Sequence, residues 1–125
     1  MYTIFLLGLI VGLMIYHVLC KCQDKLTLSN IIVKLTRQAA RWTTAARQDK
    51  NTMIQVLHAN YGTGYLWALR DIATDTEIKN ATGIDILEFE KEIVQTQDAA
   101  TLRMAKICPK YAPEKSYLTS IGGEH

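Results

Sequence analysis

Residues 2–20 read YTIFLLGLIVGLMIYHVLC, and no formal charge interrupts this run. At about 1.5 Å of rise per residue, a helix of this length spans roughly 28 Å, close to the bilayer hydrocarbon thickness of about 30 Å. A secretory signal peptide is the main alternative, but it would carry a basic residue before the run and a small-residue cleavage site. Val18-Leu19-Cys20 is a poor cleavage site. We therefore expect residues 1–22 to form one uncleaved transmembrane anchor.

Basic residues follow this anchor, whereas only Met1 precedes it; they are Lys21, Lys25, Lys34, Arg37 and Arg41. The positive-inside rule then predicts that the following domain lies on the cytoplasmic side of a single-pass protein. A glycan on the sequon Asn80-Ala81-Thr82 would contradict this orientation. The same basic residues could form a face that binds anionic headgroups, each residue contributing up to about 1 kcal/mol near the surface.

Small and reactive side chains lie within and just after the anchor. Gly8 and Gly12 have the GxxxG spacing, which lets two membrane helices approach closely, although this spacing is also common by chance. Cys20 and Cys22 lie where S-palmitoylation occurs, or are inert thiols. His17 lies near the end of the run, where an imidazole reaches the interface; an anchoring role is favoured over a proton relay.

Residues 23–108 show helical periodicity and predict a helical domain. Four helices are expected: one from Ser29 or Asn30 to about Gln48, one from Thr52 to about Ala73, a short one from Thr74 or Asp75 to Thr82-Gly83, and one from Asp85 to Pro109. Residues 109–125 have no periodicity and predict an extended C-terminal tail. The predicted fold class is all-α: a transmembrane helix followed by a small bundle of about three main helices and a short one.

The second of these helices carries a stripe of apolar and small residues at helical spacing, the pattern expected of a helix that packs on its neighbours. The stripe contains Met53, Leu57, Tyr61, Gly64, Tyr65, Ala68, Leu69 and Ile72. Tyr61, Tyr65 and Trp67 are therefore either core and boundary aromatics or an aromatic face that docks a partner protein. Gly62 and Gly64 each cost about 1 kcal/mol relative to Ala in a helix, which suggests close approach of another helix or a kink.

The two halves of the domain carry opposite charge. Among the charged residues of 25–50, all are basic except Asp49. Among the charged residues of 71–98, all are acidic except Lys79 and Lys91. The first and last helices could lie side by side with complementary flanks; alternatively, the basic helix lies near the membrane surface.

The sequence contains no P-loop, GxSxG, HExxH or dinucleotide fingerprint. His58 and Cys108 are far apart in the chain, and Glu88, Glu90 and Glu92 fan around a helix instead of forming a carboxylate pair. No ligand cluster for a metal is visible. We therefore expect that the protein is not an enzyme and binds no metal or cofactor. We also expect no nucleic-acid partner, because the net charge is only +2 and the second half of the domain is acidic.

Residues 48–85, QDKNTMIQVLHANYGTGYLWALRDIATDTEIKNATGID, resemble small membrane-anchored virion proteins of the minor capsid type from large nucleocytoplasmic DNA viruses of algae and protists. The most distinctive part is His58-Ala59-Asn60-Tyr61 with residues 64–69. The resemblance implies a non-catalytic virion component that links the inner membrane to the capsid shell, with the bilayer and capsid proteins as partners and possible helix–helix self-association. The alternative is an accessory single-pass subunit of a cellular membrane complex, of respiratory or photosynthetic type.

Overall fold

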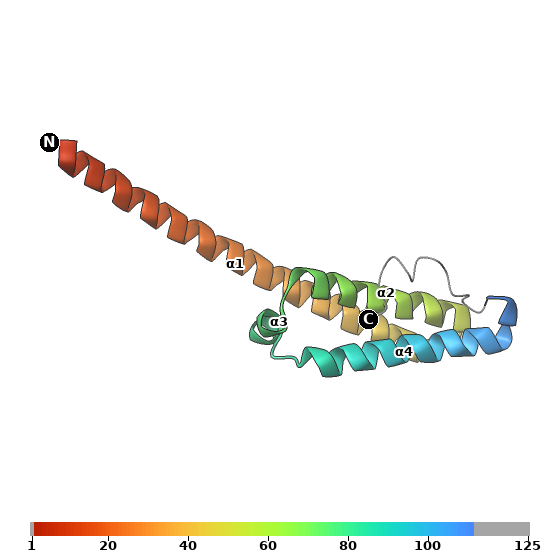
Figure 1. Cartoon of the computed structure of the whole chain (residues 1–125). Helices are drawn as coiled ribbons and strands as arrows, with labels where there is room; N and C mark the ends of the chain where they lie inside the picture. Colours follow the sequence, from red (N-terminus) through yellow and green to blue (C-terminus); the bar gives the residue numbers. More distant parts are fainter. Residues whose placement is uncertain (1, 112–125) are drawn as a thin grey trace, which may run out of the picture.

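The first helix, α1, is much longer than the sequence predicts. The computed structural model describes the backbone of residues 2–111 and the side chains of residues 6–110. Helix α1 runs from Tyr2 to Gln48 without interruption, 47 residues in all. Its first half projects as a lone helix, and its second half enters a bundle (Figure 1).

The predicted helix start at Ser29 or Asn30 is therefore wrong. An N-cap residue leaves helical geometry, and here the helix is already established upstream. No glycine or proline occurs between Leu13 and Tyr61, so no residue in this stretch favours a break. The predicted boundary between anchor and domain, at residues 22–23, falls inside this continuous helix.

Three further α-helices complete the bundle among residues 2–111. Helix α2 (Thr52–Ile72) folds back along α1, the short α3 (Asp75–Thr82) crosses beside α1 where it enters the bundle, and α4 (Ile86–Ile107) returns alongside (Figure 1). A 3-10 turn, η1 (Pro109–Tyr111), follows α4, and residues 112–125 lie outside the described residues. The predicted all-α fold, an apolar N-terminal helix followed by a small helical bundle, is confirmed.

The helix ends follow from local capping chemistry. The Asn51 side chain accepts hydrogen bonds from the backbone N–H groups of Met53 (3.0 Å) and Ile54 (3.2 Å), which starts α2. Thr74 and Glu77 form a capping box at the start of α3, and Gly83 ends α3 in the left-handed region with φ 75°. The Asp85 side chain caps α4. These ends match the sequence-based predictions within a residue or two.

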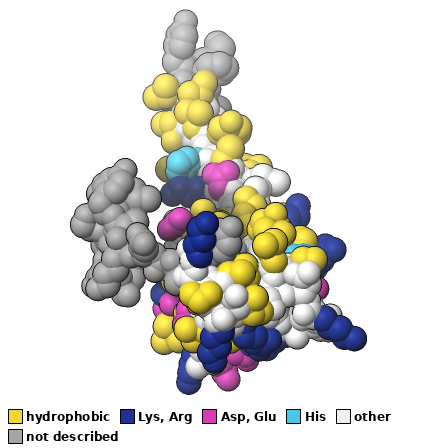
Figure 2. Space-filling view, turned by 90° about the vertical axis from the view of Figure 1, so that its right-hand side faces the viewer, with side chains coloured by type: hydrophobic (Ala, Val, Ile, Leu, Met, Phe, Trp, Pro, Cys, Tyr) yellow, Lys and Arg dark blue, Asp and Glu magenta, His cyan; other side chains and the backbone are white. Residues whose placement is uncertain are grey.

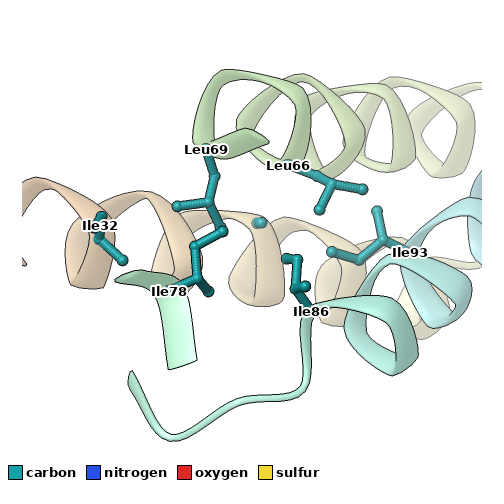
Figure 3. Close-up of a cluster of buried hydrophobic side chains, with 7 residues drawn as sticks. Ile32, Leu66, Leu69, Ile78, Ile86 and Ile93 are labelled. Carbon is teal, nitrogen blue, oxygen red and sulfur yellow. The ribbon is translucent and has the colours of Figure 1, made fainter. Parts of the chain in front are cut away.

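The core collects large aliphatic side chains from all four helices. Figure 3 shows them converging: Ile32 from α1, Leu66 and Leu69 from α2, Ile78 from α3, and Ile86 and Ile93 from α4. All six are at most 4% exposed. This cluster holds α3 and the start of α4 against the α1–α2 pair.

The inner face of α2 is not the predicted stripe. Met53, Leu57 and Tyr61 are exposed, whereas the buried residues are Gln55, Ala59, Gly62, Thr63, Leu66 and Leu69. Small side chains face α1 because the two helices lie very close together: a Cβ on Gly62 would lie 2.5 Å from Thr43 Oγ1. The buried hydroxyls of Thr43 and Thr63 donate to carbonyl oxygens of their own helices, Ala39 (2.8 Å) and Ala59 (3.0 Å). The small-residue part of the interface thus keeps the Thr43 and Thr63 hydroxyls hydrogen-bonded, whereas the buried Thr36 hydroxyl has no partner among the described residues.

Candidate membrane and protein-docking surfaces

The projecting half of α1 is an exposed apolar surface. It is the one helix among the described residues that is long and apolar enough to cross a membrane, and none of its apolar window is buried against the bundle. Figure 2 shows hydrophobic side chains covering the projection, with charged side chains gathered at its base and over the bundle. A water-exposed surface of this kind is typical of a segment that contacts lipid or another protein.

Gly8 and Gly12 lie on this projection. A Cβ added at either glycine would have nothing within 4 Å among the described residues. No helix of the described residues therefore covers them, so both glycines are open to a contact from outside the described fold. His17, Cys20 and Cys22 are exposed on the same helix.

The five predicted surface cations form two groups, and all of them are exposed. Lys21 and Lys25 lie within about 8 Å of the end of the apolar run along the helix axis, at the depth of a headgroup layer roughly 5–8 Å thick. Lys34 and Arg41 lie about 21 Å and 32 Å beyond Cys20. The Debye length is about 8 Å at physiological salt, so in an upright helix only the first group acts on headgroups.

The second group, Lys34, Arg37 and Arg41, shares one face of α1 because the residues are three and four positions apart. This basic face points away from the bundle, since the buried positions of the same stretch are Thr36, Ala39 and Thr43 on the other side. Among the described residues, none of the three cations has an ion-pair partner. The guanidinium of Arg41 instead lies 5.5 Å from the ring centroid of Trp42.

The two oppositely charged halves meet at one ion pair. Arg47 of α1 lies 3.2 Å from Glu92 of α4 and also donates to Thr96. Both charged side chains are at least half exposed, so this pair is of the kind that contributes little to stability. Arg70 lies 3.3 Å from Glu90 and also pairs with Asp75. The predicted complementarity of the first and last helices is therefore slight, and the basic face remains unneutralised.

The three predicted aromatic residues do not form one patch. Tyr61 and Trp67 are exposed, but they lie on opposite flanks of the outer side of α2. Tyr65 is half-buried against the core. Tyr61 also packs edge-on against Trp42 of α1, with ring centroids 5.2 Å apart.

A cluster that the sequence-based reasoning missed joins α1, α2 and the loop between them. The His58 Nδ1 atom lies 2.5 Å from Asp49 Oδ2, and the His58 ring lies 5.0 Å from that of Trp42. A signal was available: in an antiparallel hairpin, residues equally far from the loop centre lie side by side, and positions 42 and 58 both lie eight from residue 50. These contacts hold the start of α2 against the end of α1.

The bundle has shallow hollows on its surface, two of which are lined by charged as well as neutral side chains. One, of about 210 Å³, is lined by Arg47, Gln55 and Arg103, but Arg47 is engaged with Glu92 and Arg103 donates to Gln55 at 3.1 Å. The other, of about 330 Å³, lies between Lys25 on α1 and Glu77 and Asn80 on α3. Within residues 2–111 no group of three or more His, Cys, Asp or Glu side chains is placed to hold a metal ion.

The outer side of α2 is an uncharged surface over most of its length. Its exposed large side chains are Met53, Ile54, Leu57, Tyr61, Trp67 and Ile72. No Asp, Glu, Lys or Arg occurs between Thr52 and Leu69, although the outer side of a bundle helix normally carries charge. This face has the composition of a protein contact.

No protein-family model, curated protein or solved structure matches the chain.

Proposed function

We propose that this protein is a non-catalytic, single-pass membrane protein that holds a helical bundle at a set distance from a bilayer and links that bilayer to a protein layer. The observation that carries the proposal is the continuity of α1, which runs from the apolar projection to the far end of the bundle. A helix without a hinge transmits the position of its anchor to the bundle. A flexible linker at the same place would leave the bundle free to move.

The partner surface in this proposal is the basic face of α1. Lys34, Arg37 and Arg41 lie too far from the end of the apolar run to be neutralised by headgroups of the same membrane. They are also unpaired within the described part of the chain. An acidic protein surface at that height would complement them and would steer docking through long-range attraction.

The resemblance of residues 48–85 makes a virion the first setting to test: an inner membrane linked to a capsid shell. The alternative, an accessory subunit of a cellular membrane complex, uses the same anchor and bundle but finds its partners within the membrane. The two settings differ in which proteins lie beside the basic face.

Cross-linking mass spectrometry on the native particle or membrane separates these settings. Lys34 and Lys50 report on the outer side of α1 and its far end, and Lys79 and Lys91 report on α3 and α4. Links from Lys34 and Lys50 to shell proteins support the tether. Links only to other membrane-embedded subunits overturn it in favour of the accessory subunit.

The orientation is tested separately. We propose that the bundle lies on the cytoplasmic side, because Lys21 and Lys25 flank the apolar run directly. Asn80 of the sequon is exposed, so expression in a eukaryotic host gives a direct readout. An unmodified chain supports the orientation, and a glycan on Asn80 that disappears in Asn80→Gln overturns it.

The continuity of α1 is tested by two matched insertions after Cys22. A seven-residue Ala- and Glu-rich insertion adds two helical turns, keeps the helix phase and moves the bundle outward by about 10 Å. A seven-residue Gly- and Ser-rich insertion has the same length without rigidity. In electron micrographs of reconstituted membranes, the Ala- and Glu-rich insertion should move the layer of density from the bundle outward. The Gly- and Ser-rich insertion should broaden that layer instead. The same density for both insertions would contradict a rigid connection.

A further inference from the structure

The outer side of α2 carries an exposed heptad pattern. Apolar or small residues recur at alternating steps of three and four positions, the a and d spacing of helices that pack in parallel along a seam. The seam residues are Ile54, Leu57, Tyr61, Gly64 and Ala68. Ile54, Leu57 and Tyr61 are 42–47% exposed, so the described fold leaves much of this seam uncovered, although one side of the Tyr61 ring contacts Trp42.

Gly64 is the residue of the seam that the fold does not explain. A Cβ at Gly62 would collide with Thr43, so α1 requires that glycine. A Cβ at Gly64 would have nothing within 4 Å among the described residues. A helical glycine costs about 1 kcal/mol relative to Ala, and here no contact among the described residues requires it. Close approach of a helix backbone from outside the described fold would require a glycine at this position.

We propose that α2 pairs with α2 of a second copy of this chain, in parallel and in register, through this seam. The inference rests on the proposed anchoring, because two copies anchored in one membrane with the same orientation present their α2 helices in parallel. A two-fold axis along the membrane normal then brings each seam residue opposite its own counterpart.

The charge distribution favours a second copy over an unrelated helix. The positions flanking the seam are Met53, His58, Asn60, Tyr65, Trp67 and Ile72, none of which is Lys, Arg, Asp or Glu. Pairing of different coiled-coil helices is usually specified by opposite charges at these positions. Here two identical seams meet without like-charge repulsion. The next seam position is Asp71, which would face its own counterpart, so the contact ends at Ala68.

The pattern of side-chain size sets the shape of the pair. Ile54, Leu57 and Tyr61 lie at the end of α2 that is distant from the anchor, and Gly64 and Ala68 lie nearer to it. The two α2 helices therefore converge toward the membrane, with closest approach at Gly64. Two heptads are short for a free coiled coil, but α1 and α4 hold α2 folded beforehand, so pairing orders no new helix.

Site-directed cross-linking of the full chain in proteoliposomes tests the pairing. Cys20, Cys22 and Cys108 are replaced by Ser, and a single cysteine is introduced at Leu57→Cys in the seam or at Lys34→Cys on the exposed basic face of α1. After mild oxidation at high lipid-to-protein ratio, we expect a disulfide-linked dimer at position 57 and monomer at position 34. Adding Gly64→Lys should abolish the dimer at position 57, whereas Thr44→Lys on the exposed side of α1 should preserve it.

The outcomes separate the pairing from the anchoring. Equal dimer at both positions reflects random collision and overturns the pairing, as does an anchored chain with no dimer at position 57. Persistence of the dimer in Gly64→Lys also overturns it. A chain that alkaline carbonate washes off the membrane overturns the anchor and with it the parallel arrangement. In native membranes, a link from position 57 to a different protein would replace the second copy by that partner.

Discussion

The contrast between Gly62 and Gly64 gives the sharpest test of the packing between α1 and α2. In Gly62→Ala, the new Cβ would lie 2.5 Å from Thr43 Oγ1, 3.1 Å from Thr43 N and 3.3 Å from the Ala39 carbonyl oxygen. Two of these three neighbours are backbone atoms and cannot rotate away. The Thr43 hydroxyl can rotate only by giving up its buried 2.8 Å hydrogen bond to Ala39.

The expected magnitude combines three terms. Overpacking costs about 1–3 kcal/mol, a lost buried hydrogen bond costs about 1–3 kcal/mol, and replacing a helical glycine by Ala returns about 1 kcal/mol. We expect Gly62→Ala to lower the free energy of unfolding by roughly 1–5 kcal/mol. Gly64→Ala has no collision and should raise it by up to about 1 kcal/mol. For a domain of this size, each 1 kcal/mol shifts Tm by about 4–8 °C.

The assay is urea unfolding of the full chain in excess detergent micelles, where copies are separated, followed by tryptophan fluorescence. Trp42 lies at the α1–α2 interface beside His58 and Tyr61, so it reports on loss of this contact. The double variant Gly62→Ala with Thr43→Ala removes the nearest atom and should recover part of the loss. A Gly62→Ala protein as stable as the wild type would refute the close approach of the two helices.

Three other expectations follow from single features. Leu66→Ala, at a position 0% exposed, should cost about 2–5 kcal/mol in urea unfolding, whereas Leu102→Ala at the exposed surface should change stability by less than about 0.5 kcal/mol. Backbone and side-chain hydrogen bonds from Thr74 hold the pKa of Glu77 below its ordinary value of 4.5. The contribution of Glu77 to stability is therefore present above that value and is lost as pH falls through the lowered pKa. The difference in urea midpoint between wild type and Glu77→Gln should shrink in acid. Replacing Lys34, Arg37 and Arg41 together by Gln should leave carbonate-resistant insertion unchanged but reduce the amount of partner protein recovered with the membranes. Replacing Lys21 and Lys25 by Gln should instead increase the fraction of chains that carry a glycan on Asn80, because the signal for the cytoplasmic orientation is weakened.

Local chemistry made the helix ends of the bundle predictable. Asn51, Thr74, Gly83 and Asp85 act on backbone groups within a few residues, so their roles are readable without knowledge of the packing. The same reasoning failed at Ser29 and Asn30, because a capping residue starts a helix only where the preceding chain is not already helical.

The inner face of α2 was not predictable from the size of its apolar residues. The stripe through Met53, Leu57 and Tyr61 is the one that hydrophobic burial favours, yet it lies outside. The face that packs on α1 uses Gly62 and Thr63 instead, because close approach selects for small side chains. The sequence gives the positions of the basic residues, but only the continuity of α1 showed how far Lys34 and Arg41 lie from the end of the apolar run.

The length of α1 has a mechanical consequence. A helix of 47 residues is about 70 Å long, so a change in tilt of about 10° displaces its far end sideways by roughly 12 Å. Membrane helices adjust their tilt when the local hydrocarbon thickness changes, tilting more where the bilayer is thin. With one end in lipid, as proposed, and the bundle at the other, α1 would act as a lever arm that converts small variations in bilayer thickness into large lateral movements of the bundle.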